Sequence, residues 1–568
     1  MNFLKAGMHK LPEYMQLRQA VESNALPAVA TGLSGIHKAT IINALVQDTN
    51  KTALLLAADE AEAQRICQDL TSMGLRSFIY PTRDFTFRNV ESASREYEHQ
   101  RIQVLSRILK HDCDVVVACM DAALQYTIPP NELEGRMIEL KKGQTVSLEQ
   151  VVQSLVRCGY VRAEQIDGTG QFAVRGGILD FFTPDAPYPV RIEFWGDEID
   201  TIGLFDLESQ RRTETVDAIM LAPSVEVLVD NPSELADKIE KHASSLRGKT
   251  APKAKEILQM ECDQLRNGRH FHCADKYITM LYDRTATLLD YFSLNDTLVF
   301  VSEFHKGKER IRTTQWQWAE DVKEYLEEGV LCRGLDTYSG DWIYIQSQLE
   351  KRSTVCLEAF VRGTYEVPVR TLLNITARQL SVWGGSIALL EEDLQAMQSS
   401  GLTCIVLGGT EKTASNIATD LKEKGLSVVY MPDMSEIPDK GVIITTGTLS
   451  AGMEFPAAGF GIITHGRHTG KAAAKKRKNK HAQELYSLSE LTVGDYIVHA
   501  SHGIGVFEGI HKINMQGVVK DYIKVRYAKK DTLYVPVTQL DLVSKYIGPR
   551  EDATVKLSKL GGQDWQKN

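Results

Sequence analysis

Apolar runs alternate with amphipathic stretches near the start of the chain. Short runs of Val, Ile, Leu and Ala predict buried strands, and stretches with apolar residues at helical spacing predict helices. The predicted strands span residues 26–30, 52–58, 78–81 and 114–119, and the predicted helices span residues 40–45, 61–73 and 95–109. Strands that alternate with helices indicate an α/β domain with a parallel sheet.

The pattern changes near residue 128, where shorter strands and turns begin. A strand and turn at residues 139–144, a helix at 148–158 and hairpin strands at 170–182 and 189–200 predict an inserted α+β module. The first pattern then resumes. Its elements are residues 217–229, charged helices at 233–245 and 251–266, and an apolar strand at 297–301 followed by Glu303.

A second α/β block is predicted between residues 344 and 466. Its strands span residues 404–408, 428–431, 442–446 and 460–463, and its helix spans residues 413–424. The dense basic run that follows, residues 475–480, has no apolar periodicity, so it predicts a solvated flexible linker. Contact of this run with nucleic-acid phosphates is the alternative.

Three runs of β-branched and aromatic residues between positions 493 and 546 predict a small, bent antiparallel sheet. Ile523, Val525 and Tyr527 alternate with Lys524 and Arg526, so one face should be buried and the other wet and basic. The exposed edges of so small a sheet can accept a strand from a partner.

These patterns predict a multidomain α/β chain. The expected divisions are an α/β domain interrupted by an insert, a second α/β block, a linker, a small β-barrel and a tail. The predicted segments are residues 1–125, 126–213, 214–343, 344–465, 466–488, 489–549 and 550–568.

Composition adds limits on the class of protein. The chain has 568 residues, of which 43% are hydrophobic and 24% are charged. Its formal net charge of −9 disfavours a protein whose whole surface binds nucleic acid. None of the nine cysteines forms Cys-x-x-Cys, so neither a zinc ribbon nor a disulfide framework is expected. Without a signal-peptide core or a bilayer-length apolar run, a cytoplasmic protein is expected.

Residues 269–273 contain two histidines and a cysteine that could be mistaken for a metal cluster. His270, His272 and Cys273 are too crowded to bind one ion from a helix, and no second ligand pair has suitable spacing. No metal site is therefore predicted.

The segment between the first predicted strand and helix resembles a phosphate-binding loop, which requires G-x-x-x-x-G-K-S/T. If Gly35 is the last glycine, Ile36 and His37 replace the lysine and the hydroxyl. If Lys38 is the lysine, His37 replaces the glycine and Ala39 the hydroxyl. Apolar side chains cannot bind magnesium or neutralise phosphate. The loop is thus predicted to be inactive and to serve as a plain strand–turn–helix connection; its residues are Gly32, Gly35, Ile36, His37 and Lys38.

The C-terminal pattern, with Gly503 and Gly505 at its bend, resembles the RNA-polymerase-interaction domain that transcription-repair coupling factors share with CarD-type regulators. The resemblance implies docking on the β subunit of RNA polymerase. A generic Tudor- or SH3-like barrel with another ligand is the alternative. Lys512, Ile513 and Arg526 are the candidate contacts, chosen from the early turn and the wet strand face.

The first domain resembles the first domain of UvrB as it recurs in the coupling-factor family. The motifs Phe-x-x-Arg-Gly and Arg-x-Glu-Phe-x-Gly-Asp-Glu-Ile-Asp resemble segments by which these proteins bind UvrA. Matched position by position, Phe172, Arg175, Arg191 and Glu193 would be the contacts, and the planar fork of Arg suits bidentate pairing with carboxylates. Alternatively, the two arginines pair internally with Glu193 or Asp197 across the hairpin.

One departure from UvrB concerns DNA. Between Tyr80 and Arg95 the chain has too few residues and aromatics for the long aromatic hairpin with which UvrB clamps DNA. Damage-strand clamping is therefore not expected.

The resemblance covers the whole chain and implies transcription-coupled nucleotide excision repair. The chain would be an N-terminal portion that holds stalled RNA polymerase and recruits UvrA. ATP and magnesium would be used by motor domains beyond residue 568, acting on upstream double-stranded DNA, so the chain itself is expected to bind no cofactor and to lack ATPase activity. A UvrB-like ATP-dependent DNA helicase and a CarD-like transcription regulator are the alternatives.

Overall fold

The computed structural model describes most of the chain, and its contacts divide the chain into two units, Met1–His468 and Thr469–Asn568. The described residues are 1–88, 95–207, 209–268, 271–385, 387–466, 482–484, 493–499, 503–515, 518–528, 532–536, 543–546 and 557. The backbone alone is described for residues 482–484, 511–515, 518–522, 536 and 544–546.

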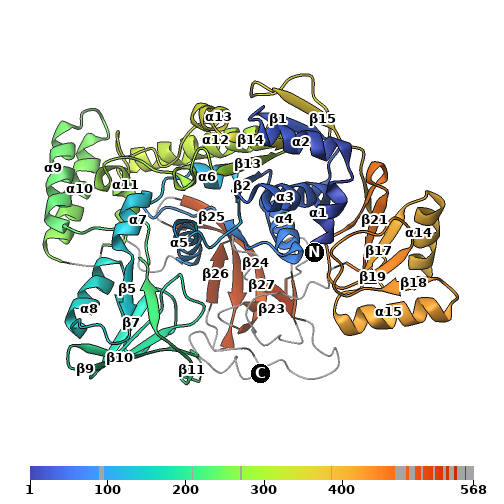
Figure 1. Ribbon diagram of the computed structural model, residues 1–568. Helices are drawn as coiled ribbons and strands as arrows, with labels where there is room; N and C mark the ends of the chain where they lie inside the picture. The colour runs from blue at the N-terminus through green and yellow to red at the C-terminus, as the bar shows by residue number, and fades with distance from the viewer. Residues whose placement is uncertain are drawn as a thin grey trace. The chain divides into compact units, whose positions relative to one another are not determined.

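The largest sheet of the first unit has seven parallel strands in the order β15-β1-β14-β13-β2-β4-β3 (Figure 1). This arrangement confirms the expected parallel α/β domain. The strands are β1 (Ala28–Thr31), β2 (Thr52–Ala57), β3 (Ser77–Tyr80), β4 (Val115–Cys119), β13 (Thr297–Ser302), β14 (Ser353–Leu357) and β15 (Thr371–Asn374).

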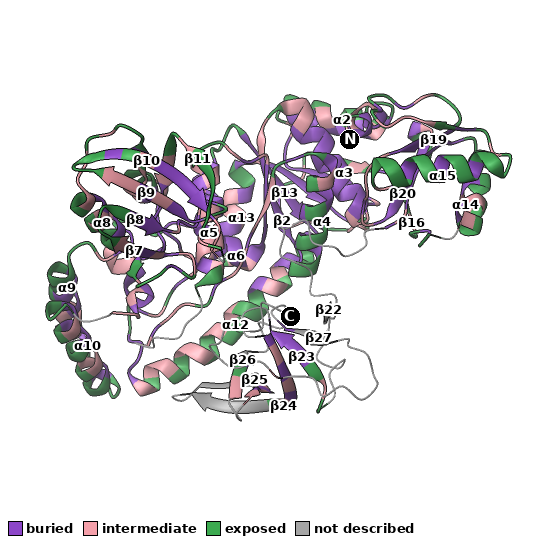
Figure 2. Ribbon diagram, turned by 90° about the horizontal axis from the view of Figure 1, so that it is seen from below, coloured by how far each residue is buried: buried purple, intermediate pink, exposed green. Residues whose placement is uncertain are grey.

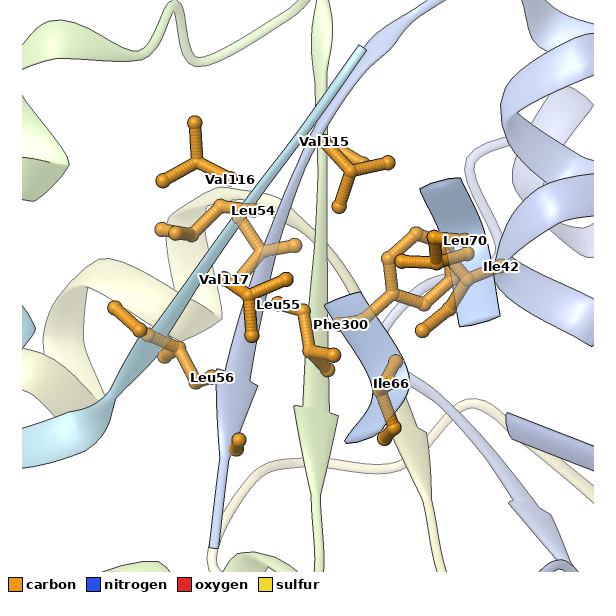
Figure 3. Close-up of a cluster of buried hydrophobic side chains, with 14 of the residues drawn as sticks. Ile42, Leu54, Leu55, Leu56, Ile66, Leu70, Val115, Val116, Val117 and Phe300 are labelled. Carbon is orange, nitrogen blue, oxygen red and sulfur yellow. The ribbon is translucent and has the colours of Figure 1, made fainter. Parts of the chain in front are cut away.

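Helices cover this sheet, which explains its continuous apolar runs. A parallel strand that is buried on both faces needs apolar side chains at successive positions, as in β2 and β4. Figure 3 shows Leu55 of β2 and Phe300 of β13 beside Ile42, Ile66 and Leu70 from the neighbouring helices.

The helices of this domain begin and end where the sequence supplies caps. The Asp59 side chain accepts a hydrogen bond from the Glu62 N–H at 2.7 Å, and Gly74 ends the same helix with a φ of 105°. The helices are α1 (Phe3–Met8), α2 (Pro12–Glu22), α3 (Gly35–Thr49), α4 (Glu60–Met73), α5 (Glu96–Leu109), α6 (Met120–Leu124) and α7 (Pro130–Arg136).

The inserted module is a six-stranded sheet, ordered β11-β10-β9-β8-β7-β6, with helix α8 and a separate core. Its first and last strands, β5 and β12, pair antiparallel, so the module begins and ends at one place. The predicted boundary at residue 213 is therefore too early, because it cuts off β12. The elements are β5 (Ile138–Lys141), α8 (Leu148–Arg157), β6 (Val161–Arg162), β7 (Gln171–Arg175), β8 (Ile178–Phe181), β9 (Val190–Trp195), β10 (Glu198–Phe205), β11 (Arg212–Val216) and β12 (Ala218–Leu221).

Helices dominate the chain between the module and β14. Two of them, α9 (Pro232–Ser245) and α10 (Ala251–Arg266), form a hairpin with its own apolar core. The longest, α12 (Phe304–Glu328), carries exposed and half-buried residues along its length (Figure 2). The remaining elements are η1 (Ala274–Tyr277), α11 (Ile278–Leu281), η2 (Leu288–Tyr291) and α13 (Trp342–Lys351).

The predicted block 344–465 is divided between two sheets. Strands β14 and β15 pair with β13 and β1 in the first sheet, and the next sheet starts only at β16, so the predicted boundary at residue 344 is wrong. That sheet has the order β16-β20-β21-β17-β19-β18. Its elements are β16 (Arg378–Leu380), α14 (Ile387–Ser399), β17 (Thr403–Leu407), α15 (Glu411–Glu423), β18 (Val428–Tyr430), β19 (Val442–Thr445), β20 (Gly452–Phe455), η3 (Pro456–Ala458) and β21 (Phe460–Thr464).

The second unit contains a six-stranded antiparallel sheet in the order β22-β27-β23-β24-β25-β26. Ile523, Val525 and Tyr527 are buried, which confirms the predicted inner face. Among the described residues no pairing joins β22 to β26, so closure into a barrel is not observed there. The strands are β22 (Ala482–Glu484), β23 (Tyr496–His499), β24 (Gly503–Met515), β25 (Val518–Arg526), β26 (Thr532–Pro536) and β27 (Val543–Tyr546).

Two global features agree with the composition. All nine cysteines are buried thiols, and none of them forms a disulfide. No helix among the described residues has the length and apolar character needed to cross a membrane.

Candidate functional site

The phosphate-loop segment is closed by a neighbouring segment of the chain. Gly32 has a φ of 84°, and a Cβ at this position would lie 2.2 Å from the carbonyl oxygen of Ile375. A side chain is excluded there by backbone, so a phosphate is not needed to explain this glycine.

His37 occupies the core where a phosphate loop would be open. Its Nδ1 accepts a hydrogen bond from the Ser34 N–H at 3.2 Å, so Nε2 carries the proton and donates to the Arg378 carbonyl at 3.1 Å. Burial lowers the pKa of His37 to about 4, which keeps the ring neutral. The ring also meets Phe455 of β20 edge-on, so this position connects α3 to the sheet of β16–β21, which we call the third sheet.

Lys38 is the motif lysine in one of the two registers, and its ammonium is fully engaged inside the protein. Nζ lies 2.8 Å from Glu303 Oε1, 2.8 Å from Ser302 Oγ and 3.2 Å from Glu62 Oε1. An ammonium has three donors, so these carboxylates and the hydroxyl occupy the positions that phosphate oxygens would take.

The carboxylate of Glu303 follows β13 and is held in place by its partners. Although burial alone raises the pKa of Glu303, the hydrogen bond and charge of Lys38 outweigh this effect and lower it. The same Oε1 accepts a hydrogen bond from the Ala359 N–H at 2.8 Å. Glu303 has a φ of 49°, a strained conformation for a residue with a side chain.

The residues before Lys38 are built into the fold. Ile36 is buried in the core, and Gly35 is the first residue of α3 rather than part of an open loop. Within the described ranges no group of three or more His, Cys, Asp or Glu residues could hold a metal ion; Arg269 and His270 lie outside these ranges.

The segment after β3, where UvrB has its hairpin, packs against helix α12. The rings of Phe85 and Phe87 lie 5.4 and 4.7 Å from that of Tyr338, and Phe87 also contacts Trp318 at 5.6 Å. Residues 89–94 are outside the described part. Phe85 and Phe87, the described aromatic residues of this segment, therefore pack against other residues of the chain.

Among the predicted UvrA contacts, Phe172 is placed on the wrong side of the sheet. It is 1% exposed and belongs to the module's core, opposite the outer face that carries Arg175. Residues three apart in a strand point to opposite faces, so Phe172 and Arg175 cannot share a surface. Phe172 is therefore a core residue of the module and does not lie on the face that carries Arg175.

The other three predicted contacts, Arg175, Arg191 and Glu193, lie on the outer face of the sheet. Their internal partners differ from the ones expected. Arg191 makes a bidentate ion pair with Asp180, at 2.7 and 2.8 Å, and Arg175 reaches the same carboxylate at 3.0 Å. Glu193 pairs with Arg212. The hydrogen bonds that Arg191 donates to Asp180 raise the pKa of Arg191, whose guanidinium also stacks 4.6 Å from the ring centre of Phe205.

Two apolar residues of this face were missed. Trp195 is 84% exposed and Ile178 is 36% exposed. Alternation from Arg191 through Glu193 places Trp195 on the same face, so the period-2 pattern of β9 could have identified it. We call Arg175, Ile178, Arg191, Glu193 and Trp195 the outer face of the module.

The candidate polymerase contacts in the second unit are only partly described. Arg526 lies on the wet side of β25, where it and Lys524 both pair with Glu508, at 2.6 and 3.1 Å. These hydrogen bonds lower the pKa of Glu508 and reduce the basic character of the face. Lys512 and Ile513 belong to β24, but their side chains lie outside the described residues. In the described part, β26 pairs only with β25, so its other side is an open edge.

Two segments of the chain match models of known protein families. Residues 138–226 match the family of the UvrB interaction domain, and residues 491–547 match the CarD-like/TRCF RID domain. A transcription-repair-coupling factor of Bacillus subtilis is 30% identical over 553 residues, which cover 94% of this chain. Those of Staphylococcus epidermidis and Staphylococcus aureus are 27% and 26% identical over 95% of the chain.

The chain is similar to transcription-repair-coupling factors over most of its length. It spans 46% of the length of the Bacillus subtilis protein, about half of each relative. The match to the UvrB interaction domain contains the whole outer face of the module. It also includes β5 and β12, in agreement with the boundaries seen in the sheet.

Replacement of Lys38 by Met should lower the free energy of unfolding by about 3–5 kcal/mol, because two buried carboxylates lose their cation. Urea unfolding measures this change, with Lys440→Met at an exposed position as the control. The triple variant Lys38→Met, Glu62→Gln, Glu303→Gln should recover most of the loss. Equal stability of Lys38→Met and the control would contradict the ion-pair assignment.

His37 should make stability depend on pH. The folded pKa, about 4, lies below the unfolded value of about 6.5, so stability is lost as the pH falls from about 6.5 towards 4. Between pH 7 and pH 5 the wild-type chain should lose about 2 kcal/mol more than His37→Gln in urea unfolding. Parallel losses in the two proteins would show that His37 is protonated in the fold.

Proposed function

We propose that this chain couples stalled transcription to nucleotide excision repair by binding RNA polymerase through one unit and UvrA through the inserted module. The observation that carries the proposal is the outer face of the module, which presents two arginines and an exposed Trp195 within a matched UvrB interaction domain. Arg and Trp are enriched among the side chains that dominate binding energy at interfaces. Two binding surfaces on one chain raise the local concentration of the repair protein at the stalled polymerase.

The second unit is proposed to dock on the β subunit of RNA polymerase. Its match to the CarD-like/TRCF RID domain and the open edge of β26 support this role. An open edge offers unpaired backbone groups to a partner strand, and alternate side chains add specificity. Tyr534 on this strand is partly exposed and is available for such a contact.

We infer that the first domain no longer uses ATP. This inference is supported by the three internal partners of Lys38 and by the closure of the loop over Gly32. We propose that ATP hydrolysis with magnesium, and translocation on upstream double-stranded DNA, belong to motor domains of the whole coupling factor and not to this first domain.

A UvrB-like helicase is the second candidate function, and nucleotide binding distinguishes it from a scaffold. Equilibrium dialysis of the chain with ATP and magnesium should detect no binding. Saturable binding that disappears in Lys38→Met would favour the helicase instead. A CarD-like regulator would bind polymerase without binding UvrA.

Substitution of the outer face should weaken binding of UvrA. Arg175→Ala and Trp195→Ala should each raise the Kd at least about fivefold, because truncation of a central Arg or Trp at an interface commonly costs more than about 1 kcal/mol. Isothermal titration calorimetry with purified UvrA measures the change. Arg333→Ala, at an exposed position outside the module, is the control. Wild-type affinity in both outer-face variants would refute this docking face.

Arg526→Ala should weaken binding to the polymerase β subunit about threefold to tenfold. The effect should be larger at low salt, because salt screens the attraction between exposed charges at an interface. Surface plasmon resonance with immobilised β subunit measures the change, and Lys440→Ala provides a matched loss of one cation in the other unit. If both variants lose affinity equally, the effect is general charge rather than a contact of β25.

A further inference from the structure

Asp180 on β8 lies beneath the outer face of the module, on the same side of the sheet, and its carboxylate is almost fully buried. Its side chain is 2% exposed, whereas that of Arg175 is 51% exposed. Oδ1 accepts a hydrogen bond from Arg191 Nε, and Oδ2 accepts from Nη2 of Arg191 and Nη2 of Arg175. A single carboxylate therefore binds two guanidinium groups from two other strands.

This sharing leaves the two arginines both ordered and charged. Each guanidinium has five donors, and the bonds to Asp180 use two on Arg191 and one on Arg175. The three groups together carry a net charge of +1, so a partner carboxylate is still attracted. Since Glu193 is paired with Arg212, it does not cancel this charge.

The orientation of Arg191 is fixed from a second side. Its guanidinium lies over the Phe205 ring, which is buried in a small cluster with Ile166 and Ala173 on the same side of the sheet. A planar cation held by a bidentate carboxylate and a ring face has little rotamer freedom left. Preorganisation of this kind lowers the entropy lost on binding.

We propose that Asp180 is a positioning residue for the docking of UvrA: it holds Arg175 and Arg191 side by side so that their outward N–H groups together bind an acidic side chain of UvrA. The inference rests on the proposed UvrA-binding function and names the chemistry of that contact. Trp195, exposed on the same face of β9 beyond Glu193, would add an apolar contact to the same interface.

The alternative role for Asp180 is competition. If the arginines acted only as charges, Asp180 would compete with the partner's carboxylate, and its neutralisation would strengthen binding by raising the net charge of the group from +1 to +2. Positioning and competition therefore predict opposite changes in the Kd for UvrA when Asp180 is neutralised.

The experiment compares Asp180→Asn with the wild-type chain in binding to purified UvrA, by stopped-flow kinetics at low and physiological salt. Positioning predicts a Kd about tenfold higher through faster dissociation, with an association rate that is unchanged or higher at low salt. Competition predicts an equal or lower Kd, and that result would overturn the inference.

A second variant keeps the test valid if Asp180→Asn unfolds the module. Arg191→Lys keeps the charge but cannot make the bidentate pair, so positioning predicts a similar rise in Kd and competition predicts almost none. In an Arg175→Ala background the effect of Asp180→Asn should shrink, because one of the two oriented groups is already absent.

Failure of the inference and failure of the proposed function give different results. If Trp195→Ala weakens binding while Asp180→Asn and Arg191→Lys do not, UvrA docks on this face and the positioning role is wrong. If the wild-type chain does not bind UvrA, or neither Trp195→Ala nor Arg175→Ala weakens binding, the positioning role and the proposed docking of UvrA on this face are both wrong.

Discussion

The first unit depends on a buried cation at the carboxyl edge of its main sheet. Lys38 extends from α3 to Glu303 after β13 and to Glu62 on α4, so one ammonium connects three segments that are far apart in the sequence. A charge in this environment is tolerated only when its partners surround it. The network fixes α3 against the sheet, and α3 in turn carries His37 and Thr40, which contact the third sheet.

The same connections fit the proposed role of the chain as a scaffold. Apolar residues of the third sheet, such as Phe460 and Met453, belong to the same core as the first sheet. Two domains that share one core and several polar contacts resist relative movement, whereas a nucleotide-driven motor needs its domains to separate and close. A scaffold gains from this rigidity, because its binding surfaces stay ordered.

Local patterns in the sequence predicted much of the fold. The parallel sheet followed from apolar runs, and the inner face of β25 followed from alternation at Ile523 and Val525. The boundary near residue 344 could not be found in this way, because β14 and β15 join the first sheet by pairing with β13 and β1, which lie much earlier in the chain. Membership of a sheet is decided by such long-range pairing rather than by local periodicity.

In the candidate sites too, local sequence patterns predicted some features, and long-range pairing decided the others. The spacing between Phe172 and Arg175 was enough to place them on opposite faces, so that error was avoidable from the sequence. The shared carboxylate of Asp180 was not visible, because Arg175, Asp180 and Arg191 come from three strands whose register only the structure gives. The partners of Lys38 were hidden for the same reason, although the failed motif itself was readable.

The pairing of β5 with β12 has a consequence for how such proteins arise. Ile138 and Leu221 lie opposite each other in register, so the two ends of the module are about one strand spacing apart, near 5 Å. A segment whose ends meet can be added to or removed from a host loop without stretching the host. Recombination could therefore transfer the whole module between unrelated frameworks in one genetic step, and the recipient would acquire its outer face intact.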